Sequence, residues 1–238
     1  MKIAIIGYGR MGKEIEQVAL DRGHQVVLKI DADNIQTIRP EDFKGVEAAI
    51  EFTNPDSAFL NINLCFNHSI PVISGTTGWL DKLDDVIKRC KSENQSFFYA
   101  SNYSIGVNLF FKLNSFLAKL MNGFENYNVF VEETHHTQKL DAPSGTALTL
   151  TEELIAKLDR KTTWEKEKAI KDNSVAVKSF REGKVPGNHK VIYESSFDNI
   201  TIEHDAKSRK GFALGAVLAA EFIAGKKGYF TMDDMLEI

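Results

Sequence analysis

The sequence has few cysteines, no long apolar run and no excess of positive charge. Cys65 and Cys90 are the only thiols among 238 residues, and they do not form a CxxC pair. This excludes a disulfide framework and a zinc knuckle, and it suits a reducing compartment. The formal net charge of -4 lacks the basic footprint of a nucleic-acid-binding protein.

No apolar stretch is long enough to cross a bilayer. The first apolar run stops at Gly7, and charges follow at Arg10, Lys13 and Glu14. It is therefore too short for a secretory signal and instead predicts a β-strand. With 43% hydrophobic and 26% charged residues, the composition is that of an ordinary globular protein. We expect a cytoplasmic protein with no nucleic-acid or membrane partner.

Strands and helices alternate over the first hundred residues. A β-branched strand at 2–6, a helix at 13–22 and a strand at 25–30 form a βαβ unit. The alternation continues with strands at 47–52, 70–74 and 96–100 and helices at 57–67 and 80–93. Such alternation is typical of a Rossmann-like, doubly wound α/β domain with a parallel sheet.

The pattern changes after Asn102. The later segments are helices at 107–122, 148–158 and 212–223 and strands at 127–134, 175–180, 190–196 and 199–204. The last two strands have no helix between them, which predicts a mixed sheet in a smaller α+β domain. The polar, lysine-rich segment 159–172 is predicted to be a solvated loop or helix end. The helix at 212–223 is expected to return to the first domain.

A glycine-rich loop joins the first strand to the first helix. It reads Gly7-Tyr8-Gly9-Arg10-Met11-Gly12 and fits the G-x-G-x-x-G pattern of dinucleotide-binding domains. The first glycine permits a tight turn, the second lets the backbone approach a pyrophosphate, and the third allows the helix to pack closely on the strand. The helix N-terminus offers free N–H groups to phosphates. Read alone, the loop could also be an ordinary strand-to-helix turn.

Asp31 lies at the end of the second strand, about twenty residues past the glycine loop. A carboxylate at this point can accept hydrogen bonds from the adenosine ribose hydroxyls and would repel a 2′-phosphate, which favours NADH. Arg10 and Lys29 are close enough in sequence to offset that repulsion, so NADPH remains the alternative. A strand-end aspartate that merely caps a turn is the structural alternative.

The most informative stretch is Glu132–Ala147, which reads EETHHTQKLDAPSGTA. His135, His136 and Lys139 supply titratable groups and a cation near the end of a predicted strand. Ser144, Gly145 and Thr146 open the next helix, where hydroxyl and N–H groups can bind a carboxylate. A metal at the histidine pair and a simple helix-capping loop are the alternatives. The usual metal partners are missing, so we predict no metal site.

The pattern HHxxKxDAPSGTA at residues 135–147 resembles the signature of the dihydrodipicolinate reductase family. The resemblance covers essentially the whole chain because other family motifs occur in family order. These are GYGRMG (7–12), SGTTGW (74–79), YASNYSIGVN (99–108) and HDAKSR followed by FALGA (204–216).

The resemblance implies an NADH- or NADPH-dependent oxidoreductase. The family reduces 4-hydroxy-tetrahydrodipicolinate, a small dicarboxylate, to tetrahydrodipicolinate with loss of water, in diaminopimelate and lysine biosynthesis. It implies that His135 is a proton donor or acceptor, that Lys139 is a second proton donor, and that His136, Gly145 and Thr146 bind substrate carboxylates. The implied cofactor contacts are Gly7 to Gly12, Asp31, Gly75, Thr76, Thr77, Tyr99, Ala100, Ser101 and Asn102.

The resemblance also implies a domain plan and an assembly. Residues 1–103, completed by 212–238, would bind the dinucleotide, and residues 104–211 would bind substrate and form the oligomer. Family members are usually homotetramers assembled through the sheets of the second domain.

The chain departs from the family pattern at a few points. Ser101 stands where proline is common, and Asn188 stands where an acidic residue is common. Serine in place of proline loosens the loop under the nicotinamide but leaves its backbone contacts possible. Asn188 puts a peripheral contact in doubt and leaves His135 and Lys139 unaffected. Two other functions compete with this reading: a Rossmann reductase acting on a different small substrate, and a nucleotide-sensing protein without catalysis.

Overall fold

The chain folds into two compact units, each with its own core. The first unit contains Met1–Ile105 and the chain from Arg209 onward, and the second contains Gly106–Ser208. The computed structural model describes residues 1–237.

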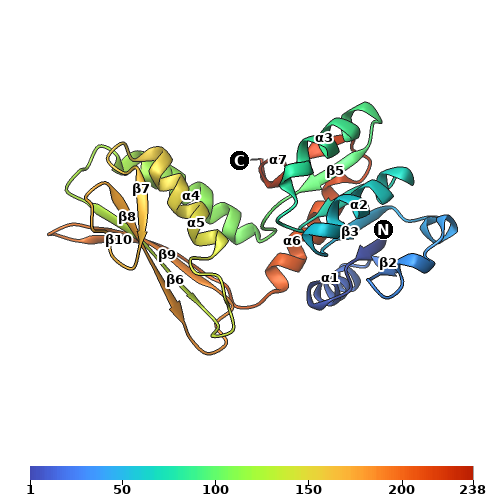
Figure 1. The fold of residues 1–238 in the computed structure, drawn as a ribbon, viewed down its shortest axis with the longest axis horizontal. Helices are drawn as coiled ribbons and strands as arrows, with labels where there is room; N and C mark the ends of the chain where they lie inside the picture. Colours follow the sequence, from blue (N-terminus) through green and yellow to red (C-terminus); the bar gives the residue numbers. More distant parts are fainter. Residues whose placement is uncertain (238) are drawn as a thin grey trace. The chain divides into compact units, whose positions relative to one another are not determined.

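The first unit is built on a six-stranded parallel sheet (Figure 1). The strand order is β11 (Gly228–Phe230), β5 (Ser96–Tyr99), β4 (Val72–Ser74), β3 (Ala48–Glu51), β1 (Lys2–Ile6) and β2 (Gln25–Ile30). Every residue of β3, β4 and β5 is buried, as expected when helices cover both faces of a parallel sheet. The predicted Rossmann-like fold is confirmed.

Alternate residues of β1 point to opposite faces of this sheet. Ile3 and Ile5 pack with α1 (Arg10–Asp21) and α6 (Lys210–Ile223). Ala4 and Ile6 pack with α2 (Pro55–Asn67) and α3 (Leu83–Ser92). The short α7 (Met232–Leu236) adds Met232 to the first of these clusters. The period of two along a strand thus provides a core on each face.

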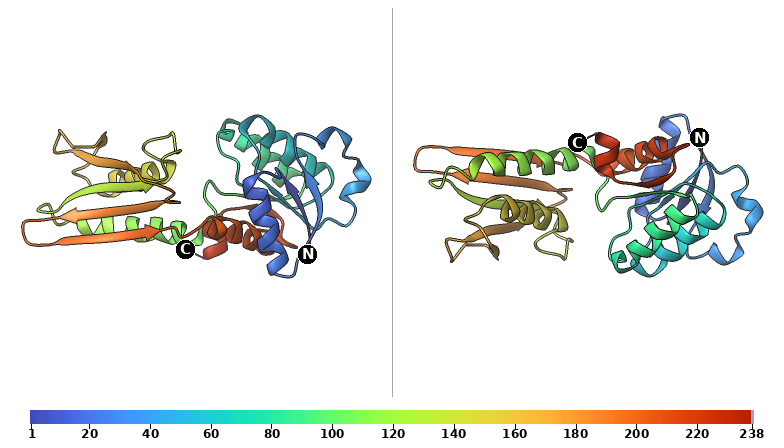
Figure 2. Two further views of the ribbon diagram at one scale, coloured as in Figure 1. Left: turned by 90° about the horizontal axis from the view of Figure 1, so that it is seen from below. Right: turned by 90° about the horizontal axis from the view of Figure 1, so that it is seen from above.

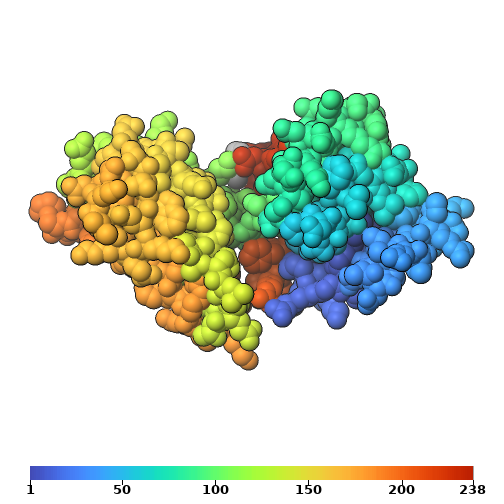
Figure 3. Space-filling model, in the orientation of Figure 1, coloured from blue at the N-terminus to red at the C-terminus, as the bar shows by residue number. Residues whose placement is uncertain are grey.

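The connection between β2 and β3 lies at the surface of this unit, where it is light blue in Figure 3. It contains short 3₁₀ helices at Ile35–Thr37 and Pro40–Phe43, and a third such turn, Leu80–Lys82, precedes α3. Phe43 anchors the connection because it is buried and stacks on His68, with 4.4 Å between ring centroids.

The second unit is built on a mixed five-stranded sheet with the order β10 (Asn199–Asp205), β9 (Asn188–Glu194), β6 (Asn128–His135), β8 (Ser174–Arg181) and β7 (Thr163–Lys166). Its pairing is antiparallel from β10 to β6 and parallel from β6 to β7, which confirms the predicted mixed sheet. Helices α4 (Ile105–Met121) and α5 (Gly145–Lys157) cover one face, as both views in Figure 2 show.

The prediction for residues 159–172 was wrong in part, because this segment contains strand β7. Three of its four residues, Thr163, Glu165 and Lys166, are polar, and sequence reasoning took the segment for solvated chain. An edge strand tolerates such residues since one side is unpaired. Pairing with β8 and packing of Trp164 against the core define the strand. Strand β11 and helix α7 were also missed.

The described residues contain no helix that is both long and apolar enough to span a bilayer.

Candidate active site

The three glycines of the first loop differ in the space around them. Gly7 has a φ of +94°, and a Cβ there would lie 2.0 Å from the Phe52 carbonyl oxygen. A Cβ at Gly12 would lie 2.4 Å from the Gly7 carbonyl oxygen, whereas one at Gly9 would meet nothing within 4 Å. Gly7 and Gly12 are therefore required by the protein's own packing. Gly9, at the start of α1, leaves open space into which a phosphate can fit.

The other residues of this loop lie on either side of the helix start. Arg10 is exposed as the first residue of α1, and Met11 lines a pocket in the same unit. The Tyr8 hydroxyl donates a short hydrogen bond to Glu16. Glu16 also binds Lys29, with 2.6 Å between Oε1 and Nζ. Lys29 is therefore already paired with a carboxylate within the protein.

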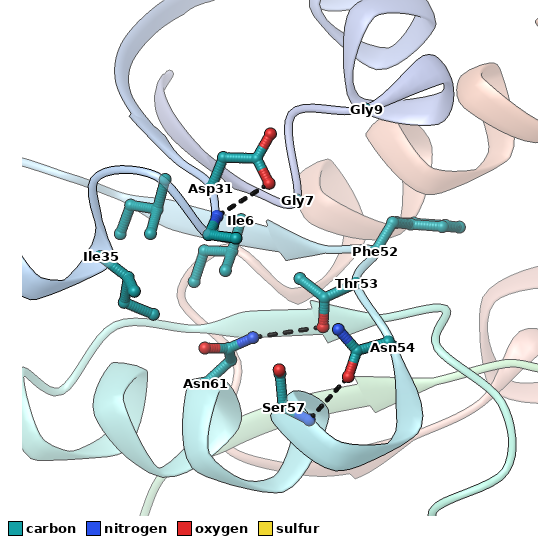
Figure 4. Close-up of a pocket in the computed structure, with 12 residues that line it drawn as sticks. Ile6, Gly7, Gly9, Asp31, Ile35, Phe52, Thr53, Asn54, Ser57 and Asn61 are labelled. Atoms are coloured by element: carbon teal, nitrogen blue, oxygen red, sulfur yellow. Dashed lines mark hydrogen bonds between the residues drawn. The ribbon is translucent and has the colours of Figure 1, made fainter.

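Asp31 lines a pocket of about 280 Å³ together with Gly7 and Gly9. One of its carboxylate oxygens accepts a hydrogen bond from its neighbour, the Ala32 N–H, at 2.9 Å. Figure 4 shows Asp31 on the glycine side of this pocket and Asn61 on the opposite side. The predicted ribose-binding carboxylate and the predicted pyrophosphate loop thus share one cavity.

A second pocket of about 300 Å³ contains the predicted nicotinamide-side loop. Gly75, Thr76 and Thr77 line it, and it shares Phe52 and Thr53 with the first pocket. A Cβ at Gly75 would lie 2.3 Å from the Phe52 ring, so this glycine allows the loop to pass the aromatic side chain. The two pockets form adjacent parts of one surface that could hold the two halves of a dinucleotide.

Residues 99–102 follow β5 at the same edge of the sheet. The Tyr99 ring is buried and packs edge-on against Trp79 at a centroid distance of 5.7 Å. Burial raises the pKa of the Tyr99 hydroxyl to about 12. Ala100 is buried, Ser101 exposed and Asn102 half-buried, and none of the four lines either pocket. The structure therefore places Tyr99 in the core.

Sequence reasoning missed Glu51, the last residue of β3. Its carboxylate is fully buried and accepts hydrogen bonds from Ser74 Oγ at 2.6 Å and Thr76 Oγ1 at 2.8 Å. It also accepts one from the Thr53 N–H at 3.0 Å. Thr53 and Thr76 line the second pocket. Their hydrogen bonds to the buried Glu51 carboxylate therefore fix the position of these two lining residues. An acidic residue ending an otherwise apolar strand was the available signal.

In the second unit, β6 ends at His135, and the following loop carries His136 and Lys139. The His135 side chain is 12% exposed, and burial, opposed by the charge of Glu133, lowers its pKa. His136 is half-buried. Lys139 lies 2.7 Å from both carboxylate oxygens of Asp141. The Lys139 ammonium is thus paired with a partner that is itself largely exposed.

Helix α5 begins directly after this loop. Ser144 is its buried N-cap, and its hydroxyl accepts a hydrogen bond from the Ala147 N–H at 3.2 Å. Gly145 is exposed, Thr146 is half-buried, and a Cβ at Gly145 would meet nothing within 4 Å. The first N–H groups of a helix lack intrahelical partners. Gly145 and Thr146 therefore offer an open anion site, whereas the Ser144 hydroxyl is engaged within the protein.

Three further residues complete this region, and sequence reasoning assigned none of them a role. Glu133 is fully buried in β6, and Arg181 and His189 both lie close to its carboxylate. Arg181 also donates a hydrogen bond of 2.6 Å to the Asp141 carbonyl, which ties the loop after β6 to the sheet. The motif quoted above contained Glu133, but its partners come from distant strands.

A parallel doubly wound sheet, a glycine loop at a helix N-terminus and a strand-end carboxylate in the same cavity define a dinucleotide-binding protein. Residues 1–103 match the family described as dihydrodipicolinate reductase, N-terminus, and residues 106–236 match its C-terminus. The chain therefore belongs to the dihydrodipicolinate reductase family.

Individual relatives agree with this assignment. The chain is 50% identical over 236 residues to the 4-hydroxy-tetrahydrodipicolinate reductase of Christiangramia forsetii, covering 99% of this chain and 98% of the relative. It is 32% identical to the enzyme of the same name from Thermosipho africanus, covering 100% and 98%. The dipicolinate-bound dihydrodipicolinate reductase of Paenisporosarcina sp. TG-14 shares the fold, with a TM-score of 0.80, 21% identity and 98% coverage of both chains.

Proposed function

We propose that this chain reduces 4-hydroxy-tetrahydrodipicolinate to tetrahydrodipicolinate, with loss of water, in diaminopimelate and lysine biosynthesis. Relatives with this reductase name match it over nearly their whole length. The observation that carries the proposal is the connection between β6 and α5. This one loop presents a titratable imidazole, an ammonium group and an open helix N-terminus, which together suit a small dianion that must be protonated.

We assign the proton chemistry to His135 and Lys139. The 4-hydroxyl of the substrate leaves as water, which gives a conjugated imine. Bound NADH or NADPH would supply a hydride to this imine, and the addition leaves electron density on the substrate ring. Lys139 stabilises that density as a fixed positive charge, and His135 delivers the proton. To contact the substrate, the Lys139 ammonium must leave its ion pair with Asp141. This is feasible because the Asp141 side chain is 59% exposed and can be solvated by water instead.

We assign the substrate carboxylates to His136 and the start of α5. The N–H groups of Gly145 and Thr146 lie at the positive end of the helix dipole, where an anion is favoured. The role of Ser144 in this site is to cap α5 and fix the first turn of the helix. In this proposal residues 104–211, which contain the second unit, form the substrate domain.

We assign the dinucleotide to residues 1–103 and the C-terminal segment from 212. Gly9 gives room for the pyrophosphate, Asp31 accepts from the ribose hydroxyls, and Gly75 to Thr77 bind the nicotinamide half. Tyr99 is buried, so we assign the remaining contacts of this segment to residues 100–102. We expect a preference for NADH because Asp31 repels a 2′-phosphate and Lys29 is already paired with Glu16.

We further propose a cytoplasmic homotetramer formed by the second unit. Helices cover only one face of its sheet, and the other face carries half-buried side chains such as Phe130 and Ile192. Helix α4 also presents an exposed apolar stripe, formed by Leu109, Leu113, Phe116 and Leu120, and Phe124 follows just after the helix. Two uncovered surfaces suit a tetramer with two kinds of two-fold contact.

The test is a coupled absorbance assay. Its unstable substrate is generated in place from pyruvate and aspartate semialdehyde by the corresponding synthase, with NADH and NADPH compared in parallel. We expect oxidation that depends on the synthase and proceeds faster with NADH. His135→Ala and Lys139→Ala should each lower kcat by about 10²- to 10⁴-fold, whereas Lys184→Ala, an exposed lysine on the β8–β9 connection, should not.

Two results would contradict the proposal. Folded protein that binds NADH but oxidises neither cofactor would exclude the reaction. An unchanged cofactor ratio in Asp31→Ser, with Asp33→Ser as the control, would exclude Asp31 as the basis of the preference.

A further inference from the structure

A buried carboxylate lies beside the imidazole to which we assign proton transfer. Glu133 and His135 are two residues apart on β6, so their side chains share one face of the sheet. Glu133 is paired across the strands with His189 of β9. As a result Glu133 Oε2 lies 3.6 Å from His135 Nε2 and 3.7 Å from His189 Nε2. The two Nε2 atoms are 3.3 Å apart.

Glu133 is held as a carboxylate by further donors. The Ser144 N–H lies 3.1 Å from both of its oxygens, and Arg181 Nη2 lies 3.3 Å from Oε1. Burial acts to raise the pKa of Glu133, but hydrogen bonds from Ser144 and Ser179 outweigh it and the pKa is lowered. A fixed negative charge therefore faces His135 from inside the protein.

The hydrogen-bond partners determine which nitrogen of each ring carries the proton. His189 Nδ1 is buried with no partner among the described residues. A buried N–H without an acceptor is costly, so we place the His189 proton on Nε2. The Pro186 carbonyl accepts a hydrogen bond from the His135 ring. Since Nε2 of His135 faces His189, the donor is Nδ1, and Nε2 of neutral His135 keeps its lone pair.

On this basis we propose that Glu133 and His189 are positioning residues for His135 in the proposed reduction. They direct Nε2 of His135 as the atom that gains and releases the proton. The His189 N–H is donated to this nitrogen while it is neutral, and to Ser144 Oγ, 3.2 Å from His189 Nε2, once it is protonated. Glu133 stabilises the protonated ring. The arrangement follows the logic of a carboxylate that orients and stabilises a catalytic histidine. The other charges that face this ring are Arg181 from β8 and Lys139 from the loop, and both oppose its protonation.

The same three side chains also have the spacing of a cation site, because one ligand-type atom from each lies within 4.8 Å of the others. The Arg181 guanidinium at the Glu133 carboxylate opposes a cation there, and both carboxylate oxygens already accept the Ser144 N–H. We therefore favour the proton network over a metal centre, and the experiment distinguishes them.

The first arm measures kcat against pH for Glu133→Gln. Because His135 acts as an acid, the rate falls as pH rises through its pKa, and the Glu133 charge raises that pKa. Removing the charge should move this fall to lower pH by about one unit or more. A pH profile identical to that of the unmodified enzyme would overturn the proposal.

The second arm compares two substitutions at His189. His189→Leu removes the N–H donor and should lower kcat by roughly tenfold, with the KM for NADH unchanged. His189→Gln places an N–H group near the same point and should recover most of the rate. Equal kcat values for all three proteins, or equal losses for Leu and Gln, would contradict the assigned role.

The third arm uses the unmodified protein and does not depend on turnover. Nitrogen NMR should show neutral His135 protonated at Nδ1 and neutral His189 protonated at Nε2. The reverse tautomers would overturn the proposal even if the variants failed to fold. Stoichiometric zinc in the purified protein, with activity lost to a chelator, would replace the network with a metal site. Failure of the reaction itself would appear separately, as absence of cofactor oxidation by the unmodified enzyme.

Discussion

At the scale of single residues, the two buried carboxylates Glu51 and Glu133 organise the two units. Each is fully buried near the carboxyl end of a strand. Each is surrounded by donors from other segments, chiefly hydroxyl groups around Glu51 and a backbone N–H, an arginine and histidines around Glu133. A buried charge is tolerated only when it is paired in this way.

The Glu51 contacts predict a stability effect. Glu51→Gln replaces one accepting oxygen with an NH₂ group that faces Ser74, Thr76 and Thr53 as donors. We expect the free energy of unfolding to fall by about 1–3 kcal/mol, with weaker NADH binding because the second pocket loses its support. Urea unfolding and a cofactor titration would measure both. The exposed Glu41→Gln should change stability by less than about 0.5 kcal/mol, and equal effects would contradict the prediction.

His189 predicts a dependence of stability on pH. Burial, with a smaller contribution from the charge of His135, lowers the pKa of His189 to about 4, against roughly 6.5 in an unfolded chain. Between these values the unfolded chain binds a proton that the folded chain does not. The free energy of unfolding should therefore fall as pH drops from about 6.5 to about 4, by about 3 kcal/mol in total.

The measurement is urea unfolding of the unmodified protein and His189→Gln at several pH values. The variant lacks this titration, so its stability should decline less on acidification. Parallel curves for the two proteins would show that His189 does not titrate as its burial implies.

At the scale of elements, α1 and β2 together control the charge near the proposed ribose site. Glu16 on α1 binds Lys29 on β2, and Lys29 also lies over the Tyr8 ring, 4.6 Å from its centroid. This pairing neutralises the lysine that could otherwise attract a 2′-phosphate. The neighbouring Asp31 then dominates the local charge.

The Glu16–Lys29 pair predicts a shift in cofactor preference. Glu16→Gln should leave Lys29 as a net positive charge and raise the ratio of kcat/KM for NADPH over NADH by about two- to fivefold, the range expected for an exposed ion pair. Steady-state kinetics with both cofactors would measure it. Glu14→Gln, on the same helix, serves as the matched control. A ratio that stays the same in Glu16→Gln would show that Lys29 does not reach the phosphate site.

At the scale of the whole molecule, the second unit leaves apolar surface that a single chain does not cover. The stripe on α4 includes Phe116, whose side chain is 62% exposed. Exposed apolar surface of this extent is typical of an interface. On the far face of the sheet, Lys178 lies over the Phe130 ring and binds Glu132, so the surface there is mixed.

We therefore predict that Phe116→Glu weakens the assembly. Light scattering coupled to size exclusion should show four chains for the unmodified protein and fewer for this variant, because a charge in a buried apolar contact is costly. Leu60→Glu, an equally exposed position on α2 of the first unit, should leave the mass unchanged. A tetramer that persists in Phe116→Glu would exclude the α4 stripe as an interface.

The sequence alone determined much about this protein, because its strongest signals are local. Hydrophobic periodicity located most helices and strands to within a few residues, and the glycine loop and the HHxxKxDAPSGTA pattern identified the family. These signals depend on neighbours in the chain, where propensity and spacing act directly.

Only the tertiary structure decided which distant side chains meet. β7 became a strand by pairing with β8, although three of its four residues are polar. Glu51 of β3 reached Thr76 just past the end of the adjacent strand β4. The sheet register brought His189 to His135, 54 residues away in the chain. A buried polar group takes its partners from whatever the fold places beside it, and one residue of register shift would point each of these side chains to the other face.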